Sequence, residues 1–443
     1  MKKIAIALFI GIVGFFLAEQ LFSIKEATLV GLIAFLVTLW TNEGLPLGVV
    51  SLLPIILFPS FDILSTSATS LNYSKSIIFL FLGGFFLAIA VEKTGLHKII
   101  ANKMLSIFPA TLSGIILSLS ITSGILSSFL SNTTTTLLLM PLALFLTEDK
   151  KIKMRFALAI AYGASIGGII TPVGTPPNLI LMGFMDDRGL QMIPFIQWVW
   201  MVLPLALIMF FVVTYILSRG AARVEIRREK PIGTMTFEQK KVFFSLIALV
   251  TLLILNAPIK PFYDGFGLNE KGILLAFGLL MFLPPVSVLE WQDSKKIPFE
   301  IIFLFGAGFS IATAFTNTGL ADSVASHILE LTTLPPILIM LAIAVMVTFT
   351  TEITSNTALI SMMLPVLYAV TEASGLDTTL FLMMATICAS YAFMLPIATP
   401  PNAIAMSSGV VRTGIMAKYG FLLNIIGIIL IVFIASTVWS KFI

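Results

Sequence analysis

The chain carries Ser131-Asn132-Thr133 and Thr175-Pro176-Pro177-Asn178, and 224 residues later it repeats both motifs as Ser355-Asn356-Thr357 and Thr399-Pro400-Pro401-Asn402. The same offset relates further pairs: Pro141 with Pro365, 77–81 with 301–305 (Ile-Ile-Phe-Leu-Phe in both), and Gly95-Leu96 with Gly319-Leu320. Polar and helix-breaking residues that recur in corresponding halves of an apolar chain indicate where a transporter with internal repeats binds its ligand. The motifs therefore predict a membrane carrier built from two homologous halves.

Composition favours a membrane location. The chain has 443 residues, of which 58% are hydrophobic and 11% charged, and its mean hydropathy is +1.06. Long apolar runs with few charges are typical of membrane spans, so membrane lipid is an expected partner. The net charge of +4 does not indicate nucleic-acid binding, because the basic residues lie in loops and form no stripe interleaved with aromatic side chains. The single cysteine, Cys388, excludes an intrachain disulfide.

The hydropathy pattern predicts an all-α integral membrane protein with about eleven transmembrane helices. The predicted spans are roughly 4–22, 27–42, 45–59, 76–92, 156–184, 191–218, 240–257, 269–286, 299–316, 378–408 and 417–440. Two further apolar segments, 107–147 and 331–370, each contain Ser-Asn-Thr near the middle. We predict that these two segments are re-entrant hairpins, which enter and leave the membrane on the same side.

The basic residues predict opposite orientations for the two hairpins. Lysine and arginine mark the cytoplasmic side of a membrane protein, and they flank segment 107–147 at both ends: Lys93, Lys98, Lys103, Lys150, Lys151, Lys153 and Arg155. The corresponding flanks of segment 331–370, at 316–327 and 371–379, contain no lysine or arginine and are predicted to be external. Homologous halves with opposite charge bias are typical of inverted-topology repeats.

The predicted organisation has four parts. Residues 1–26 form an extra first helix, which starts in the cytoplasm and is retained because no clean signal-peptide cleavage site follows it. Residues 27–218 form repeat 1, residues 219–240 a basic cytoplasmic connector, and residues 241–443 repeat 2. This layout predicts an inner-membrane protein with a cytoplasmic N-terminus and an external C-terminus.

The repeated motifs suit the binding of an anion at the ends of broken helices. Serine and asparagine are good N-cap residues for the helix after each Ser-Asn-Thr, and threonine can cap a helix that begins with Pro-Pro. Helix N-termini attract anions through free N–H groups and the helix dipole. Because the surrounding segments contain no basic residue, an anionic substrate would be bound by hydroxyl and amide groups without an arginine.

A bound dianion would benefit from a co-bound cation, since each helix terminus supplies only about half a charge. Unwound carbonyls and helix C-termini coordinate sodium in transporters with broken helices. Ser127 and Thr351, again 224 residues apart, lie one helical turn before the two Ser-Asn-Thr motifs, where a hydroxyl could complete such a site.

Three charged or titratable positions lie outside this pattern. Glu352 follows Thr351, whereas the equivalent of Glu352 in the first repeat is Ser128. An acidic residue inside a membrane is a functional candidate. Glu352 contacts a ligand directly, orients the backbone at the hairpin, or stays in contact with water in the outer vestibule. The two histidines, His97 and His327, are not related by the offset and are expected on the surface of amphipathic connectors.

The chain resembles the divalent-anion:sodium symporter family, whose members carry succinate, malate, citrate and related anions. The resemblance covers nearly the whole chain and depends on SNTTTTLLLMP, TSNTALISMMLP, TPVGTPPN and LPIATPPN, together with LPLGVVSLLPIILFP at 45–59. It implies a homodimer and an elevator mechanism, in which a transport domain slides past a fixed scaffold.

The resemblance also implies two sodium sites and one substrate site. The first sodium site would involve Ser127, Ser131, Asn132 and Gly174, and the second would involve Thr351, Thr354, Asn356 and Ala398. The implied substrate contacts are Ser131, Asn132, Thr133, Thr175, Pro176, Ser355, Asn356, Thr357, Thr399 and Pro400. Thr354 occupies a position that small apolar residues often fill in this family, and Thr175 one where serine is common.

Sodium-coupled uptake of a C4-dicarboxylate such as succinate, malate or fumarate is the function that these observations favour. A sodium-independent dicarboxylate exchanger has the same fold and stays open as an alternative. A Na⁺/H⁺ antiporter should place acidic residues at the broken helices, where only Glu352 qualifies. An intramembrane enzyme is not favoured, because no repeated acid pair, metal-ligand cluster or Ser/His dyad accompanies the motifs.

Overall fold

The computed structural model describes residues 1–42, 44–220, 234–258, 263–328 and 334–443. Within these ranges the chain forms α-helices, loops and short 3-10 turns, with no β-strand element, so the predicted all-α fold is confirmed. A helix pairs its own backbone N–H and C=O groups, which is what burial in lipid requires. Residues 221–233 of the predicted connector and 331–333 of the second hairpin lie outside the described residues.

Six helical segments of the described chain are long and apolar enough to cross a membrane. They are α2 (Ile24–Asn42), Thr66–Thr94 (which ends with α6, Ser76–Thr94), α12 (Phe195–Ser218), α15 (Phe299–Thr318), α18 (Asn356–Ser374) and Thr413–Lys441 (which begins with α21, Thr413–Thr437). The other predicted spans include α1 (Lys2–Ala18), α3 (Leu47–Leu52), α4 (Pro54–Ser60) and α14 (Glu270–Leu280), which are shorter, and α13 (Phe237–Asn256), which has 20 residues and carries charged side chains near its start.

Each predicted hairpin is a pair of helices interrupted at its Ser-Asn-Thr motif. The first consists of α8 (Leu112–Ser127) and α9 (Asn132–Phe145), and the second of α17 (Pro336–Thr351) and α18. At 1.5 Å per residue α8 and α9 are about 24 and 21 Å long, shorter than a hydrocarbon core of about 30 Å. Pro141 and Pro365 lie inside α9 and α18 without ending them.

The two predicted spans that contain Thr-Pro-Pro-Asn are broken helices. The first divides into α10 (Lys150–Gly168) and α11 (Pro176–Asp187), and the second into α19 (Thr378–Ser390) and α20 (Pro400–Ser407). Thr175 and Thr399 occupy the N-cap positions of α11 and α20, as the sequence predicts, but only the Thr399 hydroxyl accepts a capping hydrogen bond, from Asn402 N. Between the half-helices run two non-helical segments, 169–175 and 391–399.

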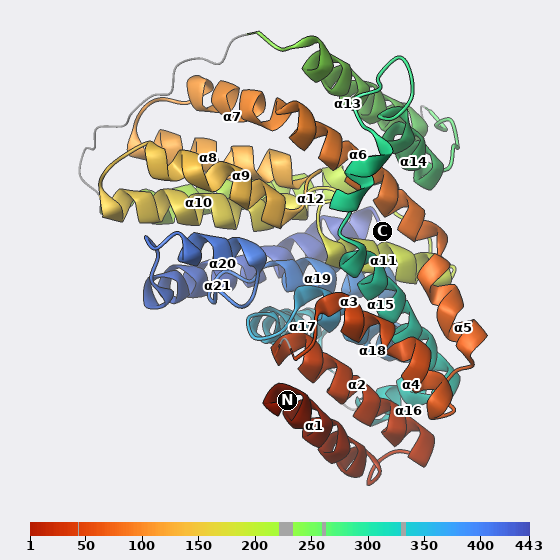
Figure 1. Cartoon of the computed structure of the whole chain (residues 1–443). Coiled ribbons are helices and arrows are strands. Elements are labelled where there is room, and N and C mark those ends of the chain that lie inside the picture. Colours follow the sequence, from red (N-terminus) through yellow and green to blue (C-terminus); the bar gives the residue numbers. More distant parts are fainter. Residues whose placement is uncertain (43, 221–233, 259–262, 329–333) are drawn as a thin grey trace.

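The two halves of the chain pack across each other. α9 of the first hairpin packs against α20, and α18 of the second packs against α11. In the same way α6 packs against α14, and α15 packs against α3. Figure 1 shows α7 (Leu96–Ile107), before the first hairpin, and α16 (Leu320–Ile328), before the second, at opposite ends of the molecule. This arrangement is the one expected of inverted repeats.

Two groups of helices recur below. We call α8–α11 and α17–α20, which contain the motifs, the motif bundle, and we call α2, α3, α6, α14 and α15 the frame. The larger hydrophobic core runs through the motif bundle, α6, α12 and α21, and a smaller core joins α2, α3 and α15. The bundle meets the frame where α15 packs on α18 and α11, and where α11 packs on α6.

The prediction for His97 is wrong, because this side chain is only 3% exposed. α7 turns the face that carries Leu96, His97 and Ala101 toward the core, and His97 Nδ1 lies 3.3 Å from the carbonyl oxygen of Val91. Burial lowers the pKa of the imidazole, which keeps it neutral. The side chain of His327 lies outside the described residues.

Helices α8 and α10 approach closely through glycines, so we predict that Gly167→Ala destabilises the protein. A Cβ atom on Gly167 would lie 2.1 Å from Gly124 Cα. The Cβ would be attached directly to the main chain of α10, and Gly124 Cα belongs to the main chain of α8. The overlap can therefore be removed only if the two helices move apart. We expect a loss of about 1–3 kcal/mol or more, seen as a lower thermal-unfolding midpoint in detergent. Gly414→Ala is the control, since no atom lies within 4 Å of its added Cβ; equal midpoints for the two variants would contradict the close approach.

Candidate substrate and cation site

All four motifs meet at one cavity of about 380 Å³ between the motif bundle and the frame. The cavity is lined by both hairpin tips and by the starts of α11 and α20. Every residue predicted to contact substrate lines it: Ser131, Asn132, Thr133, Thr175, Pro176, Ser355, Asn356, Thr357, Thr399 and Pro400. Gly174, Thr354 and Ala398, from the predicted cation sites, line it as well.

Four helix N-termini converge on this cavity, those of α9, α11, α18 and α20. Ser131 is the N-cap of α9, and its hydroxyl accepts a hydrogen bond from Thr134 N at 3.1 Å. Ser355 caps α18 in the same way, with Ala358 N at 3.5 Å. The first N–H groups of a helix have no partner within it, so the starts of α9 and α18 offer free donors to the cavity. α11 and α20 begin with Pro-Pro and lack these N–H groups at their first two positions, but all four helices direct the positive ends of their dipoles at the cavity.

The asparagines of Ser-Asn-Thr take the first helical position and turn back toward the preceding helix. Asn132 Oδ1 accepts a hydrogen bond from the Ser127 hydroxyl at 2.5 Å. Asn356 Oδ1 accepts one from Thr351 at 2.6 Å, and the Thr351 hydroxyl also lies 2.9 Å from the Ala389 carbonyl oxygen. Ser127 and Thr351 are fully buried. In both repeats the structure therefore brings together the hydroxyl and the carboxamide of a predicted cation site.

Gly174 places main chain beside this pair in the first repeat. A Cβ atom added to Gly174 would lie 3.0 Å from the carbonyl oxygen of Ser127 and 2.4 Å from that of Gly168. Hydroxyl, carboxamide and carbonyl oxygens thus gather behind the hairpin tip, and such hard oxygen donors suit an alkali cation. In the second repeat Ala398 occupies the equivalent place, whereas the Thr354 hydroxyl bonds to Thr350 O of its own hairpin at 2.9 Å.

Glu352 lies behind the second hairpin tip and orients the backbone there. It is 3% exposed and does not line the cavity. Its carboxylate oxygens accept hydrogen bonds from Met394 N and Leu395 N, each at 2.9 Å, and from Asn424 Nδ2 at 2.7 Å. Of the three roles that the sequence left open for Glu352, these contacts and its burial support backbone orientation.

In the first repeat, uncharged side chains bind the main chain at the equivalent non-helical segment, 169–175. The Ser128 hydroxyl contacts the carbonyl oxygens of Gly124 and Gly167 at 2.9 and 3.0 Å. The Thr171 hydroxyl donates to Ser128 O at 2.5 Å, and Trp198 Nε1 donates to Ile169 O at 2.9 Å. Both non-helical segments are therefore fixed to the helix that ends at the hairpin tip.

The frame supplies an apolar wall that sequence reasoning did not identify. Trp40 from α2, Phe81 and Phe85 from α6 and Leu304 from α15 line the cavity. In the described part of the chain no lysine, arginine, aspartate or glutamate lines it. No sequence signal separates these four side chains from the many other apolar residues, because only the fold turns them toward the motifs.

The broken helices, the inverted repeats and the uncharged cavity at their meeting point define a multi-pass membrane transporter. The family model for citrate transporters, CitMHS, matches residues 32–380 and 271–442. A sodium-dependent dicarboxylate transporter, SdcS of Staphylococcus saprophyticus, is 30% identical over 443 residues, which covers 93% of this chain and 85% of that protein. SdcS of Staphylococcus aureus strain USA300 is 31% identical over 445 residues, with the same coverage. The chain belongs to the divalent-anion:sodium symporter family.

A solved structure shares the fold at lower sequence similarity. The YdaH transporter of Alcanivorax borkumensis, described as having an unusual topology, superposes with a TM-score of 0.59 over 84% of this chain and 87% of that chain. The two sequences are 15% identical. This likeness confirms the fold class and nothing about the ligand.

We predict that Glu352→Gln destabilises the second non-helical segment. Glutamine keeps one acceptor oxygen but directs an NH₂ group at donors that the carboxylate now satisfies. Buried donors without an acceptor cost about 1–3 kcal/mol, which thermal unfolding of the purified protein would show as a lower midpoint. Glu372→Gln is the matched control, because Glu372 is exposed and accepts a hydrogen bond from Thr378 at the surface. Equal midpoints for both variants would refute the role given to Glu352.

Proposed function

We propose that this protein is a secondary active transporter that imports C4-dicarboxylates such as succinate, malate and fumarate together with sodium. The observation that supports this most is the meeting of all ten predicted substrate residues with two hydroxyl–carboxamide pairs around one uncharged cavity. The named relatives are sodium-dependent dicarboxylate transporters, which is consistent with the proposal.

The charges favour coupling to a cation. Four helix N-termini, each worth about half a positive charge, partly compensate the two carboxylates of a C4-dicarboxylate. In the described chain no basic side chain lines the cavity to complete the compensation. A sodium ion beside Asn132 and another beside Asn356 would add positive charge directly behind the hairpin tips. The first ion would be bound by oxygens of Ser127, Ser131, Asn132 and Gly174. The second would be bound by oxygens of Thr351, Thr354, Asn356 and Ala398.

The cavity does not favour a Na⁺/H⁺ antiporter. Such a protein needs a titratable carboxylate where the ion binds. Glu352 points away from the cavity to main-chain N–H groups, and no other acidic residue of the described chain lines it. The volume of about 380 Å³ lies within the range of small-molecule sites and accommodates an extended four-carbon dianion.

We further propose the membrane orientation that the basic residues predict. The N-terminus and the first hairpin, 107–147, would face the cytoplasm, whereas the second hairpin, 331–370, and the C-terminus would face outward across an inner membrane. Two copies of the chain would associate as a homodimer through the frame, so that the motif bundle is free to move.

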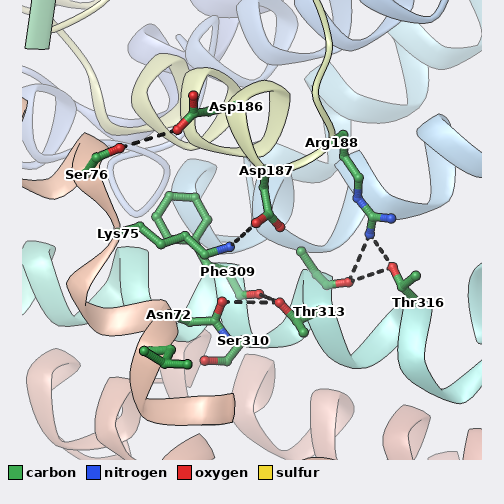
Figure 2. Close-up of polar contacts among 12 residues, drawn as sticks. Asn72, Lys75, Ser76, Asp186, Asp187, Arg188, Phe309, Ser310, Thr313 and Thr316 are labelled. Atoms are coloured by element: carbon green, nitrogen blue, oxygen red, sulfur yellow. Dashed lines mark hydrogen bonds and ion pairs between the residues drawn. The ribbon is translucent and has the colours of Figure 1, made fainter. Parts of the chain in front are cut away.

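An elevator movement of the motif bundle would carry the cavity across the membrane. The cavity lies between bundle and frame, so such a movement must separate contacts that now join them. Figure 2 shows a cluster of these contacts at the C-terminal end of α11. Asp187 pairs with Lys75 at 2.7 Å, Asp186 pairs with Lys271 of α14 at 2.7 Å, and Arg188 donates hydrogen bonds to Thr316 and Ala312 of α15.

The two ion pairs of this cluster have no counterpart at the equivalent positions of the second repeat. The residues 224 positions after Asp186 and Asp187 are Val410 and Val411, which cannot form ion pairs. Lys75, whose ammonium group pairs with Asp187, also lies 5.0 Å from the ring centroid of Phe309 in α15. The contacts therefore stabilise the present position of α11 against the frame at one end of the molecule.

We predict sodium-dependent accumulation of radiolabelled succinate by proteoliposomes that contain the protein. Uptake should require an inward sodium gradient, because the proposed sodium ions complete the charge balance at the cavity. Asn132→Ala and Asn356→Ala should each reduce uptake at least tenfold, because each removes a carboxamide oxygen that belongs both to a hairpin tip and to a proposed cation site. Asn317→Ala, on the exposed face of α15, is the control and should leave uptake unchanged. Uptake that ignores sodium but needs internal dicarboxylate would establish the exchanger instead. Near-normal uptake by both asparagine variants would refute the site.

We predict that a disulfide between α11 and α6 stops transport. Ser76 Oγ lies 3.4 Å from Asp186 Oδ2 across the boundary between frame and bundle. In the double variant Ser76→Cys with Asp186→Cys, oxidation should reduce uptake at least tenfold and a thiol reductant should restore it. The single-cysteine variants are controls, and the native Cys388 is buried. Undiminished uptake by fully cross-linked protein would show that α11 stays beside α6 throughout transport.

A further inference from the structure

The asparagines that end the two Thr-Pro-Pro-Asn motifs make the same contacts in both repeats. Asn178 Nδ2 donates to Thr171 O at 3.0 Å and lies 3.4 Å from Gly168 O. Asn402 Nδ2 donates to Leu395 O and Ala392 O, both at 3.0 Å. Both asparagines are fully buried, and neither lines the cavity. They therefore lie behind the site rather than in it.

The carbonyl groups that these asparagines bind need a partner. α10 ends at Gly168 and α19 ends at Ser390, so the carbonyls at and after these ends cannot be paired by a continuing helix. Inside a membrane no water replaces the missing donor. The orientation of each carboxamide is fixed as well, because its opposite orientation would place an oxygen against two carbonyl oxygens.

One of the two carbonyls connects each asparagine to a predicted cation ligand. Thr171 O, which accepts from Asn178, also accepts from Gly174 N at 3.3 Å. Leu395 O, which accepts from Asn402, also accepts from Ala398 N at 3.2 Å. Each asparagine thus anchors a turn of four residues whose last member lines the cavity. A shift of the Thr171 or Leu395 carbonyl would move Gly174 or Ala398 directly.

We infer that Asn178 and Asn402 are positioning residues for the two cation sites. Each fixes the non-helical segment of its own repeat so that the main chain of Gly174 or Ala398 stays beside the hairpin tip. Asn178 serves the first site and Asn402 the second. This inference depends on the proposed sodium coupling, and it assigns the asparagines no contact with substrate or ion.

The test is sodium binding by purified protein, followed as the rise of the thermal-unfolding midpoint with sodium concentration in the absence of substrate. Asn178→Leu and Asn402→Leu remove the two donors at similar side-chain size. We expect each variant to raise the half-saturating sodium concentration at least tenfold. In proteoliposomes the KM for succinate at saturating sodium should stay within twofold of the wild-type value, and high sodium should restore the uptake rate.

Thr386→Val is the matched control, because Thr386 is buried in α19 and its hydroxyl bonds only within its own helix, to Leu382 O at 2.8 Å. A merely structural role would lower the midpoint by the same amount at every sodium concentration and leave half-saturation unchanged, which would overturn the inference.

If a leucine variant does not fold, Asn178→Asp or Asn402→Asp replaces it. The protonated carboxyl retains one donor, so a smaller increase is expected, and no increase would again overturn the inference. A wild-type protein whose midpoint ignores sodium would instead refute the proposed coupling.

Discussion

Backbone that leaves helical geometry inside a membrane must find its hydrogen-bond partners within the protein, and the whole site depends on how this chain provides them. Four helix breaks face one cavity, and each leaves N–H groups on one side and carbonyl groups on the other. Serine hydroxyls cap the N–H groups at the hairpin tips. Asn178 and Asn402 pair the carbonyls of the non-helical segments. The first N–H groups of α9 and α18 belong to residues that line the cavity.

At equivalent helix breaks, the two repeats use different side chains to form hydrogen bonds with the main chain. At the second break a buried carboxylate, Glu352, accepts two main-chain N–H groups, whereas at the first break Ser128 contacts carbonyl oxygens. The hydroxyl–carboxamide pairs at the tips, by contrast, are nearly identical in the two halves. The hydroxyl–carboxamide pairs and the supporting asparagines Asn178 and Asn402 have therefore kept the internal symmetry, whereas Glu352 and Ser128, at equivalent positions, have diverged.

The sequence allowed the motifs, both hairpins, both broken helices and their threonine caps to be predicted, because helix breaks in an apolar chain need local, recognisable residues. It did not predict the burial of His97, since an amphipathic helix pattern does not say which neighbour covers its polar positions. It could not identify Trp40 and Phe81 as cavity walls, because that depends on packing between distant helices. Glu352 was identified as unusual, but its partners in the 391–399 segment required the fold.

Cross-packing between the repeats ties the proposed cation sites to the substrate site. α9 carries Asn132 and packs against α20, whose N-terminus lines the cavity beside Thr399. α18 carries Asn356 and packs against α11 in the same way. Each asparagine contributes its side chain to a cation site and its helix terminus to the cavity, so an ion bound behind a tip would order the surface that a dicarboxylate contacts. In the proposed cycle the sites would therefore fill together and move together, because neither hairpin can shift without the broken helix of the other repeat.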